Sequence, residues 1–165
     1  MEKPEVLVVA SKLPPFMMDA LHGAFRVHER IHETDPDRFR QVAHRIVGVA
    51  ANGEARAPRA LIEQLPALKV VSVFGVGYDG IDVAAAKDRG AVVTHTPDVL
   101  NDDVADLAIG LMLSIARRIP QADRFVREGR WPQGPMPLAS KVSGARIGIV
   151  GLGRIGQAIA RRAEG

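Results

Sequence analysis

Residues 146–156 read Arg-Ile-Gly-Ile-Val-Gly-Leu-Gly-Arg-Ile-Gly. The first five form a short apolar run typical of a β-strand, and residues 157–162 are typical of the start of a helix. Between them, Gly151, Gly153 and Gly156 have the spacing G-x-G-x-x-G. This order is typical of dinucleotide-binding folds, in which the glycines allow a tight turn, close approach to the pyrophosphate and close helix packing. A turn whose glycines serve packing alone is the alternative.

Short β-branched runs alternate with helical stretches upstream of this turn. The runs lack polar alternation, which is typical of a parallel sheet covered by helices on both faces. We therefore predict an α/β fold, an open doubly wound parallel sheet that ends near residue 98. The expected strands are residues 6–9, 26–28, 46–50, 70–74 and 92–94, and the expected helices are residues 16–24, 37–43, 57–64 and 83–89.

A long helix is predicted to begin at Asn101, a good N-cap residue, with two aspartates in its first turn. Its sequence is mostly apolar from 104 to 119, and Pro120 is expected to stop it. Because it is apolar around most of its circumference, we expect it to be buried between two domains. A charged segment and a proline-rich connection then lead to a second domain that begins near Lys141.

A second glycine loop, residues 74–82, follows the expected strand at 70–74. A glycine loop at the carboxyl end of a parallel strand offers backbone N–H groups to an anion, such as a substrate carboxylate. A turn that requires small residues explains this loop equally well. Asn52 and Gly53 lie at the end of another expected strand, as a second wall of the same cleft or as a simple turn.

The histidines and the acidic residues near the long helix give weaker signals. None of the histidines is paired with an acid at a spacing that suggests a general base, so surface or packing roles are expected. Asp102, Asp103 and Asp106 resemble a magnesium site, but helix N-terminal charge explains the first two without a metal, and we expect no metal site. The histidines are His22, His28, His32, His44 and His95.

Composition limits the classes of function. Hydrophobic residues make up 47% and charged residues 25% of the 165-residue chain, as in ordinary globular proteins. One Trp and one Tyr argue against base stacking, so no nucleic-acid partner is expected. No apolar run approaches the roughly 18 residues of a membrane helix. The chain has no cysteine, and we expect a cytoplasmic location.

Three ordered segments, residues 73–82, 94–106 and 150–156, resemble the D-isomer-specific 2-hydroxyacid dehydrogenases, and within them most closely the glyoxylate and hydroxypyruvate reductases. The resemblance implies hydride transfer between NAD or NADP, with NADPH slightly favoured, and a small 2-keto or 2-hydroxy acid. It implies a flavodoxin-like substrate domain over 1–98 and a hinge, interdomain helix and connecting loop over 99–140. The first strand and helix of a truncated Rossmann NAD(P)-binding domain would occupy 141–165, and the full-length parent would be a homodimer formed through the Trp131 region.

The resemblance also implies roles for individual residues. The backbone at Val76 and Gly77 would receive the substrate carboxylate, with Asn52 nearby, and Val104 would face the nicotinamide. The family's catalytic arginine, glutamate and histidine lie downstream of the glycine turn, so no catalytic residue is assigned and the chain alone is expected to be inactive. An NAD-binding, corepressor-like interaction protein and a nonfunctional truncated remnant are the alternatives. The pyrophosphate would be held by Gly151, Gly153, Arg154, Ile155 and Gly156.

Overall fold

The computed structural model describes residues 2–164. The chain divides into two compact units, an N-terminal unit over Met1–Val99 and a C-terminal unit over Leu100–Gly165. None of the helices described is long and apolar enough to cross a membrane.

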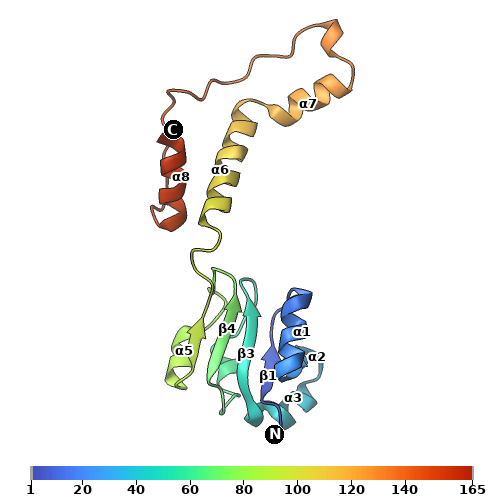
Figure 1. Cartoon of the computed structure of the whole chain (residues 1–165), viewed down its shortest axis with the longest axis vertical. Coiled ribbons are helices and arrows are strands. Elements are labelled where there is room, and N and C mark those ends of the chain that lie inside the picture. Colours follow the sequence, from blue (N-terminus) through green and yellow to red (C-terminus); the bar gives the residue numbers. More distant parts are fainter. Residues whose placement is uncertain (1, 165) are drawn as a thin grey trace. The chain divides into compact units, whose positions relative to one another are not determined.

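The N-terminal unit contains a five-stranded parallel sheet with strand order β2-β1-β3-β4-β5 (Figure 1). This is the flavodoxin-like order of a doubly wound sheet, so the predicted fold class is confirmed. All five expected strands form, with ends that differ by two residues at most. The strands are β1 (Glu5–Val8), β2 (Arg26–Glu29), β3 (Ile46–Asn52), β4 (Val70–Phe74) and β5 (Val92–Thr94).

Helices follow the strands as expected, and local side-chain caps explain two of their starts. The Asp35 carboxylate accepts a hydrogen bond from the Arg38 amide, and Asp82 accepts one from the Ala85 amide. The helix expected over residues 57–64 is shorter because Pro58 adopts an extended conformation at its N-cap. The helices are α1 (Pro15–Ala24), α2 (Ile31–Thr34), α3 (Pro36–Val42), α4 (Arg59–Ile62) and α5 (Val83–Asp88), with a 3-10 turn at Ala43–Arg45.

The core of the N-terminal unit lies around its two central strands. All four residues of β1 are buried, and β3 is buried along most of its length. Strand β4 instead alternates: Val71 and Val73 are buried, whereas Val70 and Phe74 are partly exposed. The expectation that helices cover both faces of the sheet is therefore wrong at β4, where one face stays exposed. The largest fully buried side chains are Leu7, Ile46, Val49, Ile62, Leu65, Val71 and Val73.

The C-terminal unit is built on two helices, α6 (Asn101–Ala116) and α8 (Arg154–Glu164), which pack against each other. Ala105 on α6 and Ala158 on α8 are fully buried. Arg162 on α8 donates hydrogen bonds to Asp102 and Asp106, which lie one turn apart on α6. Small residues and this ion-pair cluster therefore join the two helices. Helix α7 (Ile119–Arg127) and a 3-10 turn at Trp131–Gln133 connect them.

Several expectations for this unit are wrong. Residues 146–150 do not form a strand, because no described segment provides the partner that a strand requires. Helix α6 is not buried: Leu107, Leu111 and other apolar residues are more than half exposed, since α8 covers a single side. Asn101 is the first helical residue, with Leu100 in the N-cap position. Helix α6 ends at Ala116, before it reaches Pro120, and Pro120 instead lies in the first turn of α7, which begins at Ile119.

Candidate functional site

Three loops of the N-terminal unit meet at the carboxyl edge of the parallel sheet. Asn52 ends β3 and pairs with Phe74 at the end of β4, and His95 follows the last residue of β5. Because parallel strands end at the same edge, the register of the sheet brings these segments together. The predicted substrate residues Asn52, Val76 and Gly77 therefore share one edge.

The loops after β3 and β4 approach each other so closely that they require glycine. Gly75 has φ of +156°, and a Cβ on it would lie 3.3 Å from the amide nitrogen of Gly53. A Cβ on Gly80 would overlap the carbonyl oxygen of Ala55. The Ala57 amide donates to the Gly80 carbonyl at 2.9 Å. The glycines at 75 and 80 thus have a packing role, while Val76 and Gly77 lie between them.

The side chain of Asn52 makes one hydrogen bond to the backbone and has one acceptor atom without a partner. Its side-chain amide donates to the carbonyl oxygen of Lys12 at 3.3 Å. Its buried Oδ1 atom accepts no hydrogen bond from the part of the chain that the structure describes. An unpaired buried acceptor is costly, so Asn52 is suited to accept a donor from a bound molecule.

The three glycines of the turn in the C-terminal unit differ in their surroundings. Gly151 has φ of +89°, a left-handed conformation that L residues rarely adopt. A Cβ on Gly153 would meet no atom within 4 Å, whereas a Cβ on Gly156 would overlap the Gly151 carbonyl oxygen. The first glycine is therefore required by the turn and the third by packing. The second is open to a ligand, which is the division of roles in a dinucleotide-binding turn.

The residues that flank this turn belong to the same unit. Arg154 and Ile155 begin α8, and the Gln157 amide donates to the Gly153 carbonyl at 2.9 Å. Val104 lies on α6 with about a third of its surface exposed. The structure thus places all predicted cofactor residues on two packed helices and the turn before α8. Among residues 2–164, no group of three His, Asp or Glu side chains could hold a metal ion.

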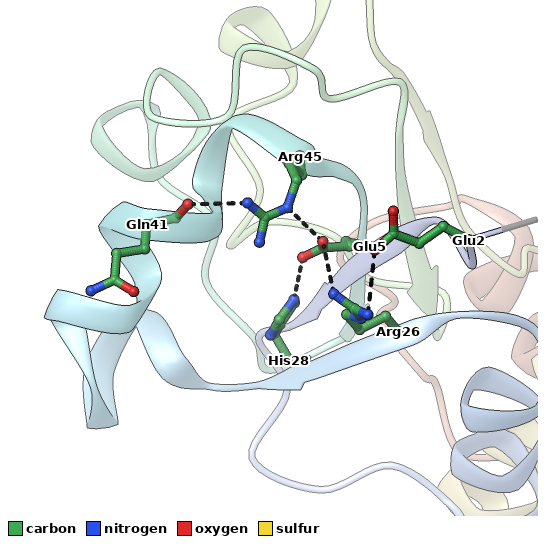
Figure 2. Close-up of polar contacts among 6 residues, drawn as sticks. All are labelled: Glu2, Glu5, Arg26, His28, Gln41 and Arg45. Atoms are coloured by element: carbon green, nitrogen blue, oxygen red, sulfur yellow. Dashed lines mark hydrogen bonds and ion pairs between the residues drawn. The ribbon is translucent and has the colours of Figure 1, made fainter.

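A buried acid–histidine pair lies at the opposite, amino edge of the sheet, where no functional residue was predicted (Figure 2). His28 Nε2 donates to Glu5 Oε2 at 2.7 Å, and both side chains are at least 95% buried. Arg45 donates to the other oxygen of Glu5 at 2.6 Å, and Arg26 lies 3.6 Å from it. The packing role predicted for His28 fits its burial, but the absence of a paired acid was a wrong expectation. Glu5 and His28 are 23 residues apart and meet only through parallel pairing of β1 and β2.

The Glu5 carboxylate is held in its ionised form. Burial by itself raises the pKa of Glu5, but hydrogen bonds and positive charge from Arg45 and His28 outweigh burial and lower the pKa below its ordinary value of 4.5. Because the pKa of Glu5 is lower in the folded state than in the unfolded state, ionised Glu5 stabilises the folded state at pH values above 4.5. This contribution is lost as the pH falls below 4.5 and through the lowered pKa of the folded state.

We expect this linkage to appear in a comparison with Glu5→Gln, which cannot ionise. The difference in free energy of unfolding between the two proteins is expected to be largest near neutral pH and to shrink below the ordinary pKa of 4.5. Hydrogen exchange of the core amides of β1 and β3 over a pH series measures this difference. A difference that stays constant through the acid range would contradict the lowered pKa of Glu5.

The family model described as D-isomer specific 2-hydroxyacid dehydrogenase, catalytic domain, matches residues 6–163. The chain belongs to this family. The three segments that suggested the resemblance all lie within the match, so the predicted family is confirmed.

Relatives in this dehydrogenase family are similar over most or nearly all of the chain. The glyoxylate/hydroxypyruvate reductase HPR3 of Arabidopsis thaliana is 42% identical over 170 residues, covering 99% of this chain and 53% of the relative. Glyoxylate/hydroxypyruvate reductase A of the same plant is 55% identical over 119 residues, covering 72% of this chain and 38% of the relative. The chain thus spans about half the length, or less, of these curated relatives.

Solved structures of dehydrogenases in this family share the fold. The 2-hydroxyacid dehydrogenase of Ketogulonicigenium vulgare matches with a TM-score of 0.89 and 45% identity, over 99% of this chain and 52% of that one. An NADPH-dependent glyoxylate/hydroxypyruvate reductase of Sinorhizobium meliloti, solved with NADP and malonate, matches with a TM-score of 0.83 and 42% identity. The match covers 99% of this chain and 50% of the Sinorhizobium reductase.

Proposed function

We propose that this chain supplies the substrate-carboxylate loop and the first half of the cofactor site of an NAD(P)-dependent D-2-hydroxyacid dehydrogenase. The enzyme would be of the glyoxylate/hydroxypyruvate reductase type. The observation that carries the proposal is the turn at Gly151, Gly153 and Gly156. Gly151 is required by its left-handed φ and Gly156 by close packing, whereas Gly153 has neither a positive φ nor any atom within 4 Å of its Cβ position. A packing turn gives no reason for glycine at 153, whereas a backbone that contacts a pyrophosphate does. The first turn of α8 directs its amides and helix dipole toward the same place.

The carboxylate of a small 2-keto or 2-hydroxy acid would bind at the other loop, at the backbone of Val76 and Gly77. Its support is the position of this loop at the carboxyl edge of the sheet, beside the unpaired oxygen of Asn52. The Sinorhizobium relative was solved with malonate, a small dicarboxylate. The role of the chain's own residues is to bind and orient the substrate so that its reacting carbon has a fixed position. The bound nicotinamide supplies the hydride.

The cofactor, the domain roles and the assembly belong to the same proposal. NADPH is favoured over NADH because the Sinorhizobium relative is described as NADPH-dependent. Residues 1–98 would be the substrate domain, 99–140 the hinge and connecting segment, and 141–165 the start of the cofactor domain. Val104 would face the nicotinamide. A homodimer is proposed because Trp131 and Leu138 are 65% and 96% exposed, and a second copy could cover such apolar side chains. The proposed location is the cytoplasm.

A hybrid enzyme tests this proposal. Residues 1–165 are joined to the part of Arabidopsis HPR3 that follows its match to this chain, about half of that reductase. We expect the hybrid to oxidise NADPH in the presence of glyoxylate or hydroxypyruvate, as measured by absorbance, with the HPR3 part alone as the control. A folded hybrid that binds NADPH but reduces neither acid would contradict the proposed reaction and favour an NAD-binding interaction protein.

A further inference from the structure

Two hydrogen bonds join the segment after β5 to the loop at Gly75–Gly77. The Thr96 amide donates to the Gly75 carbonyl oxygen at 2.9 Å. The His95 ring contacts the Val76 carbonyl oxygen through Nδ1, also at 2.9 Å. Because a carbonyl oxygen can only accept, Nδ1 carries the proton and donates it. Two neighbouring residues therefore hold two successive carbonyl groups of the loop.

The direction of these carbonyls fixes the direction of two amides. In a planar trans peptide the N–H points opposite to the C=O of the same peptide unit. The Gly75 carbonyl shares its unit with the Val76 amide, and the Val76 carbonyl shares its unit with the Gly77 amide. Both amides therefore point away from the donors that hold the carbonyls. Within residues 2–164, neither amide donates a hydrogen bond to the protein.

The peptide between Val76 and Gly77 depends on His95 for its orientation. Gly77 is exposed, and glycine permits backbone conformations that would allow this peptide unit to turn over. The ring of His95 is itself held by an edge contact with Tyr78, at 4.8 Å between ring centroids and 68° between planes. The His95 bond thus selects one of several orientations that the glycine would otherwise allow.

We propose that His95 is a positioning residue for the substrate carboxylate. By donating from Nδ1 to the Val76 carbonyl, it keeps the Val76 and Gly77 amides directed outward, where together they can bind one carboxylate. The inference rests on the proposed function, which places a carboxylate at this loop. His95 need not contact the substrate, since it acts through the backbone.

Two substitutions separate the donor from the ring. In His95→Asn the side-chain nitrogen is the same number of bonds from Cα as Nδ1, so the donor to Val76 is retained while the ring is lost. In His95→Phe the ring that contacts Tyr78 is retained while the donor is lost. The probe is malonate, titrated into the 15N-labelled 165-residue chain, with the Val76 and Gly77 amide shifts as the readout. The neutral diamide malonamide is the control ligand, and thermal unfolding of each variant is measured in parallel.

We expect wild type and His95→Asn to bind malonate with dissociation constants within about twofold of each other. His95→Phe is expected to bind about 2- to 10-fold more weakly, which corresponds to one hydrogen bond. A merely structural role for the ring predicts the reverse order, with Asn the weaker binder. Equal binding by wild type and His95→Phe would overturn the positioning role and leave the carboxylate loop intact. If malonate does not move the two amides of wild type, the proposed carboxylate site itself is wrong, and the inference with it.

Discussion

Gly153→Val is expected to weaken NADPH binding by the hybrid enzyme about 10- to 100-fold, and to leave its fold unchanged. A Cβ at 153 would meet no atom within 4 Å in the protein, so we expect the folded state to accommodate a side chain there. The same side chain would occupy the space in which the backbone approaches the pyrophosphate. Loss of one hydrogen bond to a charged group, about 1.5–3 kcal/mol, accounts for a change of this size. Fluorescence titration with NADPH and the KM for NADPH measure it.

Two other glycines provide the controls. Gly156→Val would overlap the Gly151 carbonyl oxygen, so it is expected to disrupt the start of α8 and lower the thermal stability of the C-terminal unit. Gly110 lies on α6 with open space at its Cβ position. Gly110→Ala is therefore expected to stabilise that helix by about 0.5–1 kcal/mol without changing the affinity for NADPH. A folded Gly153→Val protein with unchanged affinity for NADPH would remove the pyrophosphate assignment.

Glu5→Ala is expected to lower the free energy of unfolding of the N-terminal unit by about 3 kcal/mol. Removing one partner of a buried ion pair costs about 3–5 kcal/mol because the other partner remains buried and uncompensated. His28 would lose the acceptor of its buried Nε2, since its side chain is 3% exposed. Arg45 is 45% exposed and can be hydrated, which favours the lower end of the range. Hydrogen exchange of the slowest amides in β1 and β3 measures the change.

Glu2→Ala is the matched control for Glu5→Ala. Glu2 also pairs with an arginine, Arg26, at 3.4 Å, but its side chain is 77% exposed. Exposed ion pairs contribute little, so this substitution is expected to change the free energy of unfolding by less than about 0.5 kcal/mol. Equal effects of the two substitutions would show that the buried cluster around Glu5 does not stabilise the sheet.

Local sequence patterns predicted the parts of this protein whose cause is local. Each strand of the sheet was visible as a β-branched run, and the glycine turn was visible from its spacing and from the helical residues after it. These features depend on backbone geometry over a few residues, such as the left-handed conformation at position 151, which glycine adopts without strain. The apolar run at residues 146–150 predicted a strand by its local pattern, but a local pattern does not form a strand without a partner. Pairing depends on a segment elsewhere in the structure, and none is described.

The contacts that join distant segments were decided by tertiary structure. The pair of Glu5 and His28 arises because parallel pairing of β1 and β2 places Arg26 opposite Glu5 and brings His28, two residues further along β2, within reach of the Glu5 carboxylate. Likewise, His95 gave no functional signal by itself, and its bond to Val76 exists because β4 and β5 end at the same edge of the sheet. The sequence alone therefore determined the fold class and the two glycine-rich loops, through conformational preferences that act within a few residues. Tertiary structure decided which side chains hold those loops and which charges are buried, because strand register is a property of the whole sheet.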